Sequence, residues 1–358
     1  MSNKSNAELK KLNKLCLQES SYYLNNIDLI AASNFLRPDI AVLTEYKIQR
    51  SMEGILGKRP YAGTKYLDQI ESIAVETVKR IFKAEHANVQ LHSGSQANQA
   101  AYAAFLQPGD KIISMRFDNG GHITHGNPVN FSGKIYKFYY YSINSRTQNL
   151  DYPEILKISR KIKPKMIVAG ASSYPRKIDY TKFGRIAKKT DAFFMADISH
   201  PAGLIAAGFL PSPFPHADVV TTTTEKTLWG PHAAVIMCKE RYAKDIDRAV
   251  HPGTQSSIPI SRIVQICKAL LFVETKKFKN YTKKVLNNSK VLEKKFSEIN
   301  NAVLFGGTDS HFVVINVRDA FGLSGQEAEK VLEKVGIFTN RQVIPWEKKT
   351  FMKRLDLE

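Results

Sequence analysis

Apolar residues between about residues 105 and 240 follow two alternating patterns, short continuous runs and stretches of helical spacing. The short runs predict strands, and the helical spacing predicts amphipathic helices between some of them. The predicted strands span residues 111–115, 134–140, 166–171, 193–197, 219–224 and 233–238, and the predicted helices span 152–161 and 180–189. This alternation is typical of an α/β fold with a largely parallel sheet covered on both faces by helices.

Helical periodicity also flanks this region. Leu9, Leu12 and Leu15 predict a helix within residues 5–25, and an apolar face predicts another over 68–82. Nearer the C-terminus, the pattern predicts a strand over 312–317 and a helix over 326–334. We therefore expect an N-terminal helical arm over residues 1–28, a large domain over 29–279 and a small C-terminal domain over 280–358.

The amino-acid composition indicates the general class to which the protein belongs. A chain of 358 residues that is 43% hydrophobic buries a large core. It has no apolar run near the roughly 20 residues that span a bilayer, and its first residues lack the apolar segment of a signal peptide. Cys16, Cys238 and Cys267 have no metal-ligand spacing, which indicates a reducing cytoplasm without a disulfide framework, and we expect no metal site. We expect a cytoplasmic protein without a membrane partner.

The formal net charge of +19 permits a nucleic-acid partner or attraction to anionic ligands. The lysines are spread over helical stretches such as 276–284 rather than gathered in one tail. The sequence contains no helix-turn-helix, zinc-finger or RNA-binding signature. A generally basic surface without a nucleic-acid partner is therefore the favoured interpretation.

The run over 219–224 is β-branched throughout and ends just before Lys226. Such a run suits a buried strand, and ligands of open α/β sheets lie at the carboxyl ends of the strands. Lys226 has two interpretations on this evidence. It is either a solvated loop lysine or a nucleophilic amine that forms a Schiff base with a carbonyl cofactor such as pyridoxal phosphate.

Ser93, Gly94 and Ser95 open a helix of small residues. Free backbone amides at a helix start favour an anion, so this segment is a candidate phosphate cup, although an ordinary N-cap explains it equally well. No Gly-x-Gly-x-x-Gly or Walker A pattern follows the predicted strands, which gives dinucleotide and nucleoside triphosphate sites no support.

Polar residues also end other predicted strands. Ser172 follows one strand, Asp197 ends another with His200 close behind, and His122 follows a third. Each residue alone is more often structural. Together with Lys226 they provide a carboxylate for a pyridine nitrogen, a flat ring to stack, an anion cup and an amine, which are the elements that pyridoxal phosphate needs.

Several motifs in order resemble serine hydroxymethyltransferase. They are His-Ala-Asn-Val-Gln-Leu-His-Ser-Gly-Ser-Gln-Ala-Asn at 86–98, His-Ile-Thr-His-Gly at 122–126, Val-Asn-Phe-Ser-Gly-Lys at 129–134, Ala-Gly-Ala-Ser-Ser-Tyr-Pro-Arg at 169–176 and the segment 219–228. The resemblance extends from about Leu29 to Pro345. It implies a fold-type I pyridoxal-phosphate transferase, in which the large domain contains a mostly parallel sheet of seven strands covered by helices. It also implies a homodimer or homotetramer that moves a one-carbon unit between serine, glycine and tetrahydrofolate.

The resemblance implies roles for individual residues. Catalytic roles fall to Lys226 as the Schiff-base lysine, Asp197 as partner of the pyridine nitrogen, His122 as the stacking ring, Glu53 in proton transfer, and His200. Cofactor contacts fall to Ser93, Gly94, Ser95, His122, Ser172, Asp197, His200, Thr223 and Lys226. Substrate contacts fall to Tyr61 and Ser33, and no metal ligand is implied.

The sequence departs from the family at several of these places. Where the family has a tyrosine that reaches the neighbouring subunit's cofactor, this chain has Ser51. Where the family has the first tyrosine of a pair, this chain has Pro60. The family's histidine before the Schiff-base lysine is replaced here by Glu225, and a nearby arginine of the family is replaced by His232. The phosphate loop Gln-Gly-Gly-Pro, contributed across the dimer, reads Gln-Ser-Ser-Ile at 255–258, where side chains obstruct an approach that glycine permits.

Two further departures concern the substrate. The family's Leu-Ile-Ala-Ser-Glu-Asn-Phe reads Leu-Ile-Ala-Ala-Ser-Asn-Phe at 29–35, and no residue corresponds to the arginine that clamps the substrate carboxylate. We expect an incomplete small domain and cofactor binding with poor turnover. Two alternatives remain open, a pyridoxal-phosphate-binding homologue with little or no folate-dependent activity and an aldolase acting on β-hydroxy amino acids.

Overall fold

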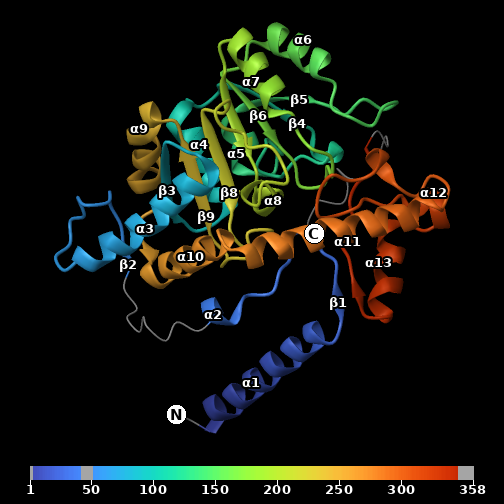
Figure 1. The fold of residues 1–358 in the computed structure, drawn as a ribbon, viewed down its shortest axis with the longest axis horizontal. Helices are drawn as coiled ribbons and strands as arrows, with labels where there is room; N and C mark the ends of the chain where they lie inside the picture. Colours follow the sequence, from blue (N-terminus) through green and yellow to red (C-terminus); the bar gives the residue numbers. More distant parts are fainter. Residues whose placement is uncertain (1–2, 42–50, 346–358) are drawn as a thin grey trace.

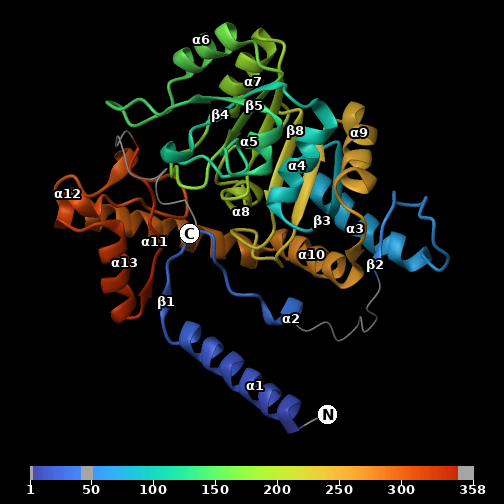
Figure 2. The ribbon, with the colours of Figure 1, turned by 180° about the vertical axis from the view of Figure 1, so that it is seen from behind.

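A computed structural model describes residues 3–41 and 51–345 of the chain (Figure 1). Predictions that concern residues 42–50 and 346–358, including the C-terminal end of the expected small domain, lie outside the described residues. A mostly parallel sheet with helices on both faces forms the main body. The N-terminal helix lies to one side of it and the C-terminal segments to another (Figures 1 and 2).

The elements alternate along the middle of the chain as the apolar pattern indicates. The helices are α1 Asn3–Leu24, α2 Pro38–Ala41, α3 Lys65–Phe82, α4 Gly94–Phe105, α5 Phe131–Ile135, α6 Tyr152–Ile162, α7 Tyr180–Lys189, α8 Ala202–Ala206, α9 Ala243–Arg248, α10 Ile260–Val273, α11 Lys276–Ser297, α12 Val317–Phe321 and α13 Gly325–Lys334, with short turns η1 Phe117–Asn119, η2 Glu240–Tyr242, η3 Ala249–Thr254 and η4 Leu304–Gly306. The strands are β1 Ile27–Asp28, β2 Ser51–Met52, β3 His86–Leu91, β4 Lys111–Met115, β5 Lys137–Tyr141, β6 Met166–Gly170, β7 Phe193–Asp197, β8 Val219–Thr223, β9 Ala234–Cys238, β10 Ile258–Pro259 and β11 Ile337–Phe338.

The central sheet has seven strands in the order β3-β9-β8-β7-β6-β4-β5. The strands from β4 to β8 run parallel, whereas β9 is antiparallel to both β8 and β3. This confirms the expected α/β fold with a mostly parallel, seven-stranded sheet. The carboxyl ends of β4, β6, β7 and β8 meet at one edge, where the predicted site residues follow them.

Strand β3 is a strand that the apolar pattern does not predict. Its buried positions include Asn88 and Gln90, so no apolar run marks it. Asn88 donates to Asp247 at 2.9 Å, and Gln90 donates to Glu71 at 2.7 Å. Polar side chains are tolerated in the strand interior because each has a partner.

Two other predictions are wrong in detail. The strand predicted over 134–140 begins later, because Asn130 accepts from the amide of Ser132 and caps helix α5 before β5 starts. The strand predicted over 312–317 does not form, and only Ile315 makes an isolated bridge, to Val303. Asn316 accepts from the amide of Asp319 and starts helix α12 there instead.

The core has two layers, one on each face of the sheet. Ile167 and Phe194 pack with Phe183 of α7, whereas Val168 and Met195 pack in a separate cluster with α4. The alternation along β6 and β7 follows from the strand geometry, which directs successive side chains to opposite faces. Both faces are apolar, so these strands read as continuous apolar runs.

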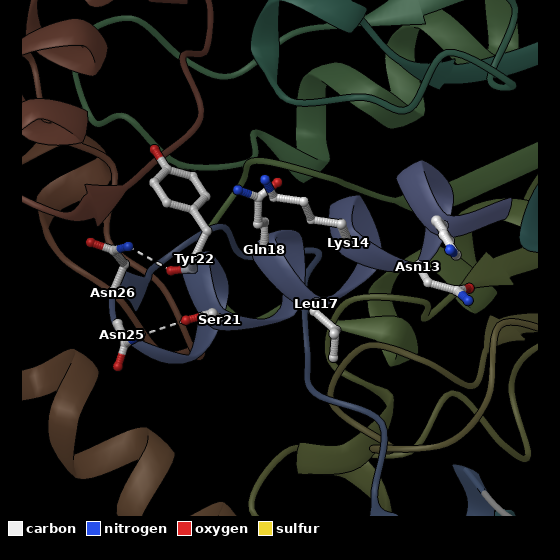
Figure 3. A pocket seen from close by; sticks show the side chains of 9 residues that line it. Asn13, Lys14, Leu17, Gln18, Ser21, Tyr22, Asn25 and Asn26 are labelled. Atoms are coloured by element: carbon white, nitrogen blue, oxygen red, sulfur yellow. Dashed lines mark hydrogen bonds between the residues drawn. The ribbon is translucent and has the colours of Figure 1, made fainter. Parts of the chain in front are cut away.

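Helix α1 lies away from the sheet and joins the body through β1, which pairs with β11 (Figures 1 and 2). Its large apolar side chains are exposed; they include Leu9, Leu12, Leu15, Leu17 and Leu24. A shallow hollow of about 750 Å³ runs along this helix, lined by residues such as Lys14, Leu17, Gln18 and Tyr22 (Figure 3). One face of α1 therefore has no apolar partner within the described chain.

The expected boundary between the large and small domains, at residues 279 and 280, falls inside α11. That helix runs from the large body to the C-terminal segments (Figure 1). The division into domains stays a prediction. Among the described residues, none of the helices is long and apolar enough to span a bilayer.

A buried ion pair fastens the loop after β2 to helix α3. The Arg59 guanidinium is fully buried, donates to Asp68 at 2.7 Å and also pairs with Glu71. Burial raises the pKa of the Glu71 carboxyl, although Arg59 and Gln90 oppose the shift. Removing the guanidinium would leave this carboxyl buried without its cation.

We expect Arg59→Ala to lower the free energy of unfolding by about 3 to 5 kcal/mol, because breaking a buried pair strands one charge. Urea unfolding followed by circular dichroism measures the change. The matched control is Arg80→Ala, which breaks an exposed pair with Glu274 and should have little effect. Equal losses in the two variants would contradict a special contribution from the buried pair.

Candidate active site

Lys226 lies in the loop that joins β8 to β9. The loop is closed at its base, where the Thr224 amide donates to Ala233 at 3.0 Å and the Gly230 amide donates to Thr224 at 2.8 Å. Lys226 lines a large cleft of about 2150 Å³, bordered by the C-terminal segments and by α11. The geometry therefore presents the amine to a cavity at the carboxyl end of β8.

Thr227 ties this loop to the turn after β7. Its hydroxyl accepts from the Gly203 amide at 2.9 Å and donates to the carbonyl of His200 at 2.7 Å. A side chain at Gly203 would collide with the Thr227 backbone, since an added Cβ would come within 2.0 Å of its oxygen. The close approach holds the lysine loop against the strand end that carries Asp197.

Asp197, the last residue of β7, is buried and its carboxylate accepts from several donors. Oδ1 accepts from the Ser199 hydroxyl at 2.6 Å and its amide at 3.0 Å. Oδ2 accepts from Asn98 Nδ2 at 2.9 Å and contacts His125 Nε2 at 3.1 Å. Burial opposes ionisation, but the hydrogen bond and charge of His125 outweigh it and hold the pKa of Asp197 well below its usual value. The group is a carboxylate at neutral pH.

His122 and His125 lie on the loop after β4. The His122 backbone amide donates to His125 Nδ1 at 3.4 Å, and the two rings are 5.7 Å apart. Burial, with His125 as the second cause, lowers the pKa of His122 to about 4. The loop therefore presents a neutral imidazole near Asp197.

His200 follows β7 and stacks on His311, with ring centroids 5.6 Å apart. Burial and then the charge of Lys226 hold the pKa of His200 well below its usual value. Burial lowers the pKa of His311 to about 4, although its hydrogen bond to Ala31 opposes the shift. Both imidazoles are neutral at pH 7.

The candidate phosphate cup starts helix α4. Ser93 caps the helix by accepting from the Gln96 amide at 3.3 Å. Gly94 abuts Thr223 at the end of β8, where an added Cβ would lie 2.5 Å from a methyl carbon. Ser95 is exposed beside them. The glycine thus permits the helix N-terminus to meet the end of β8.

The remaining predicted residues divide into two groups. Ser172 lines the same cleft as Lys226. Its amide donates at 2.7 Å to the carbonyl of Gly120, which shortly precedes His122 in the sequence. Ser33 also lines this cleft. Glu53 and Tyr61 do not meet them; they bond to each other on the loop between β2 and α3, at the edge of the molecule (Figure 1). That hydrogen bond raises the pKa of Tyr61.

Strand β2, just before Glu53, pairs with β10, through Met52 and Ile258. The segment 255–258, which the resemblance assigns to a phosphate loop shared across a dimer, therefore lies beside the segment that carries Glu53. Glu53, Tyr61 and the residues 255–258 are not among those that line the cleft of Lys226 in their own chain.

Several residues of the site are not predicted from the sequence. Asn98, Thr124, His125 and Thr221 form the buried contacts around Asp197 and His122. Asn98 and His125 lie within the motifs 86–98 and 122–126, and those motifs are the sequence signal for both residues. Thr221 has no such signal, because a threonine within a β-branched run is indistinguishable from the rest of the strand.

The departure at Glu225 also has a structural counterpart. Its Oε1 lies 3.6 Å from His232 Nδ1, and its Oε2 is buried without a hydrogen-bond partner. The two positions where the family has an imidazole and a guanidinium thus form a contact between a carboxylate and an imidazole. The contact lies in the same loop as Lys226.

Two buried atoms among the predicted residues lack a protein partner, Thr223 Oγ1 and His200 Nδ1. Buried polar atoms are normally satisfied, so an unpaired hydroxyl beside the α4 N-terminus fits an anionic ligand. With the amine, the carboxylate and the stacking ring, the residues present fit pyridoxal phosphate. A mostly parallel sheet with such a lysine at its carboxyl edge is the arrangement of a fold-type I pyridoxal-phosphate enzyme.

Comparison with known proteins identifies the family. The family model described as serine hydroxymethyltransferase matches residues 5–354. A serine hydroxymethyltransferase of Mycoplasma capricolum is 43% identical over 349 residues, 97% of this chain and 84% of the relative. One of Mycoplasma mycoides is 44% identical over 339 residues, 94% of this chain and 81% of the relative. The chain belongs to the serine hydroxymethyltransferase family.

The lowered pKa of His311 predicts a pH-dependent stability. In the unfolded chain this group titrates near 6.5, and in the folded protein near 4. The unfolded state therefore binds more protons between these values, so stability falls as the pH falls through this window.

For the cofactor-free protein we expect His311 to account for a loss of about 2 kcal/mol between about pH 7 and about pH 5. The variant His311→Asn should lose that much less over the same interval. Urea unfolding at both pH values provides the measurement. The control is His92→Asn, because His92 is exposed. An unchanged pH dependence in His311→Asn would contradict the prediction.

Proposed function

We propose that this protein is a pyridoxal-phosphate-dependent serine hydroxymethyltransferase that interconverts serine and glycine with tetrahydrofolate as co-substrate. The observation that carries the proposal is the amine of Lys226, at the carboxyl end of β8, on the same cleft as His125, whose ring contacts the buried carboxylate of Asp197 at 3.1 Å. Membership of the serine hydroxymethyltransferase family supports serine, glycine and tetrahydrofolate as the substrates. The two alternatives, a binding protein without folate-dependent activity and an aldolase, are not favoured by the names of the relatives.

The residues would hold the cofactor by complementary chemistry. Lys226 would bond to its carbonyl carbon, Asp197 would keep its ring nitrogen protonated, and His122 would stack on its ring. Ser93, Gly94, Ser95 and Thr223 would bind its phosphate through amides and hydroxyls, and Ser172 and His200 would lie beside its phenolic oxygen. When bound, the cofactor supplies an electron sink for bond cleavage at the amino-acid substrate.

The protonation states support these roles. The lowered pKa of Asp197 keeps this group anionic, as a partner of a protonated ring nitrogen must be. The lowered pKa of His122 keeps a second positive charge away from that ring. Glu53 would exchange a proton with the serine hydroxyl, and Tyr61 and Ser33 would contact the substrate.

The first experiment concerns Lys226. Purified protein supplied with pyridoxal phosphate should show a band near about 420 nm, typical of the cofactor bound to a lysine. Lys226→Ala should lack this band, whereas Lys239→Ala, at the opposite end of β9 from the Lys226 loop and paired with Asp218, should retain it. Added serine or glycine should change the wild-type spectrum. A band that persists in Lys226→Ala would refute the assignment, and turnover with serine and tetrahydrofolate measures the activity itself.

A homodimer or homotetramer is the proposed assembly, with each site completed by the partner's loop that carries Glu53 and Tyr61. Two observations support it. Glu53 and Tyr61 do not line the cleft of Lys226 in their own chain, and their loop neighbours segment 255–258 through β2 and β10. The exposed leucines of α1 and the hollow beside them offer a further surface for a second copy (Figure 3).

Subunit complementation tests the shared site. Lys226→Ala and Glu53→Gln should each be inactive as pure homodimers, because each lacks one half of every site. After the two are unfolded and refolded together, random pairing should restore about a quarter of wild-type activity, from one intact site per heterodimer. Light scattering should report a dimer or tetramer. No recovery from a mixed dimer would show that Glu53 acts within its own chain.

A reducing compartment such as the cytoplasm is the proposed location. Cys16, Cys238 and Cys267 are free thiols, and a reducing environment keeps them so. Small molecules are the proposed ligands, and neither nucleic acid nor membrane is a proposed partner. The division into an arm at 1–28, a large domain at 29–279 and a small domain at 280–358 is likewise a proposal.

A further inference from the structure

The ring of His122 has two donors at the same nitrogen. Nδ1 lies 3.2 Å from the backbone amide of Thr124 and 2.7 Å from the Thr124 hydroxyl. A backbone N–H donates only, so Nδ1 must accept and therefore carries no proton. In the neutral ring, the proton is then on Nε2.

The hydroxyl of Thr124 is oriented by a third residue. Its oxygen accepts from Asn98 Nδ2 at 2.8 Å, and an amide nitrogen also donates only. The hydroxyl's own hydrogen is thus left for His122 Nδ1. Thr124 is fully buried, so water does not compete for either bond.

The orientation of the Asn98 amide is fixed by its other contacts. Its Oδ1 accepts from the Thr221 hydroxyl at 2.7 Å, and its Nδ2 also donates to Asp197 at 2.9 Å. A flipped amide would place an oxygen against the Asp197 carboxylate, which is repulsive. One amide group therefore serves both Asp197 and Thr124.

We propose that Thr124 is a positioning residue that holds His122 with its proton on Nε2, and that Asn98 couples this arrangement to the carboxylate of Asp197. The inference rests on the proposed function for the role of His122 as the stacking ring. The chain of bonds runs from Thr221 through Asn98 and Thr124 to His122. It joins the two groups that would contact the cofactor ring, one at its nitrogen and one at its face.

The arrangement has a chemical consequence. A neutral imidazole packs against a protonated pyridine ring without repulsion, whereas an imidazolium would add a second cation. Two donors at Nδ1 oppose protonation of that nitrogen, and burial and the charge of His125 separately lower the pKa of His122 to about 4. A histidine without the hydroxyl would retain only the weaker backbone contact at 3.2 Å.

The first measurement uses the wild-type protein without and with pyridoxal phosphate. Nitrogen-15 chemical shifts of the histidine rings distinguish a protonated from an unprotonated nitrogen. The His122 signals are identified by their loss in His122→Gln. We expect Nδ1 unprotonated and Nε2 protonated at neutral pH in both samples. A proton on Nδ1, or a charged ring, in the cofactor-free wild type would overturn the proposal without any variant.

The second measurement compares Thr124→Val with Thr124→Ser. Valine removes the hydroxyl at similar volume, whereas serine retains it. In Thr124→Val we expect the His122 nitrogen shifts to move toward a mixture of the two tautomers. We also expect the dissociation constant of pyridoxal phosphate, from its absorbance, to rise by about tenfold. Thr124→Ser should stay near wild type in both.

A merely structural role for Thr124 would lower stability and leave the nitrogen shifts of His122 unchanged. That result in a folded Thr124→Val protein, or identical shifts in the two variants, would overturn the proposal. If Thr124→Val does not fold, the wild-type shifts still decide the tautomer. The proposed function fails independently, since it depends on the Lys226 band, whereas the tautomer is measured without the cofactor.

Discussion

The carboxylate of Asp197 is the constraint around which the site is built. A buried ion is costly unless donors replace the lost water, and here Ser199, Asn98 and His125 all donate to it. These donors come from the turn after β7, from α4 and from the loop after β4. To keep one carboxylate ionised, three distant segments of the sequence must meet at the same strand end. That same meeting brings the candidate cup and the imidazole of His122 beside the lysine loop.

Much of the fold and part of the site follow from the sequence for physical reasons. Strands buried on both faces read as apolar runs, and their carboxyl ends meet at one edge, so Ser172, Asp197 and Lys226 are predictable as neighbours. Strand β3 is not predicted, because its buried polar residues interrupt the apolar run. The contacts of Asn98 and Thr221 are not predictable from the sequence either, because they depend on which side chains of the folded chain face each other. Glu53 and Tyr61 are recognisable only through resemblance, and their absence from the lining of the Lys226 cleft is a property of the folded chain.

The neighbourhood of Lys226 also contains contacts with segments that are distant in the sequence. Trp229 stacks on Tyr281 with ring centroids 4.3 Å apart and donates to the carbonyl of Phe35 at 2.7 Å. Asn34 donates to the Lys226 carbonyl at 3.0 Å. The lysine loop is thereby joined to α11 and to the segment that follows β1. Glu225 and His232 lie in the same loop, with Glu225 partly buried and His232 exposed.

The closed base of the lysine loop has a consequence for its motions. Because β9 runs antiparallel to β8, the chain returns at once to the centre of the sheet, and the amides of Thr224 and Gly230 are bonded within that return. The loop cannot swing open at its base without separating two interior strands. Exchange of these two amide hydrogens with solvent would therefore proceed through large-scale opening of the sheet, with rates close to those of the strand core. The backbone that carries the amine is in this sense as persistent as the fold itself.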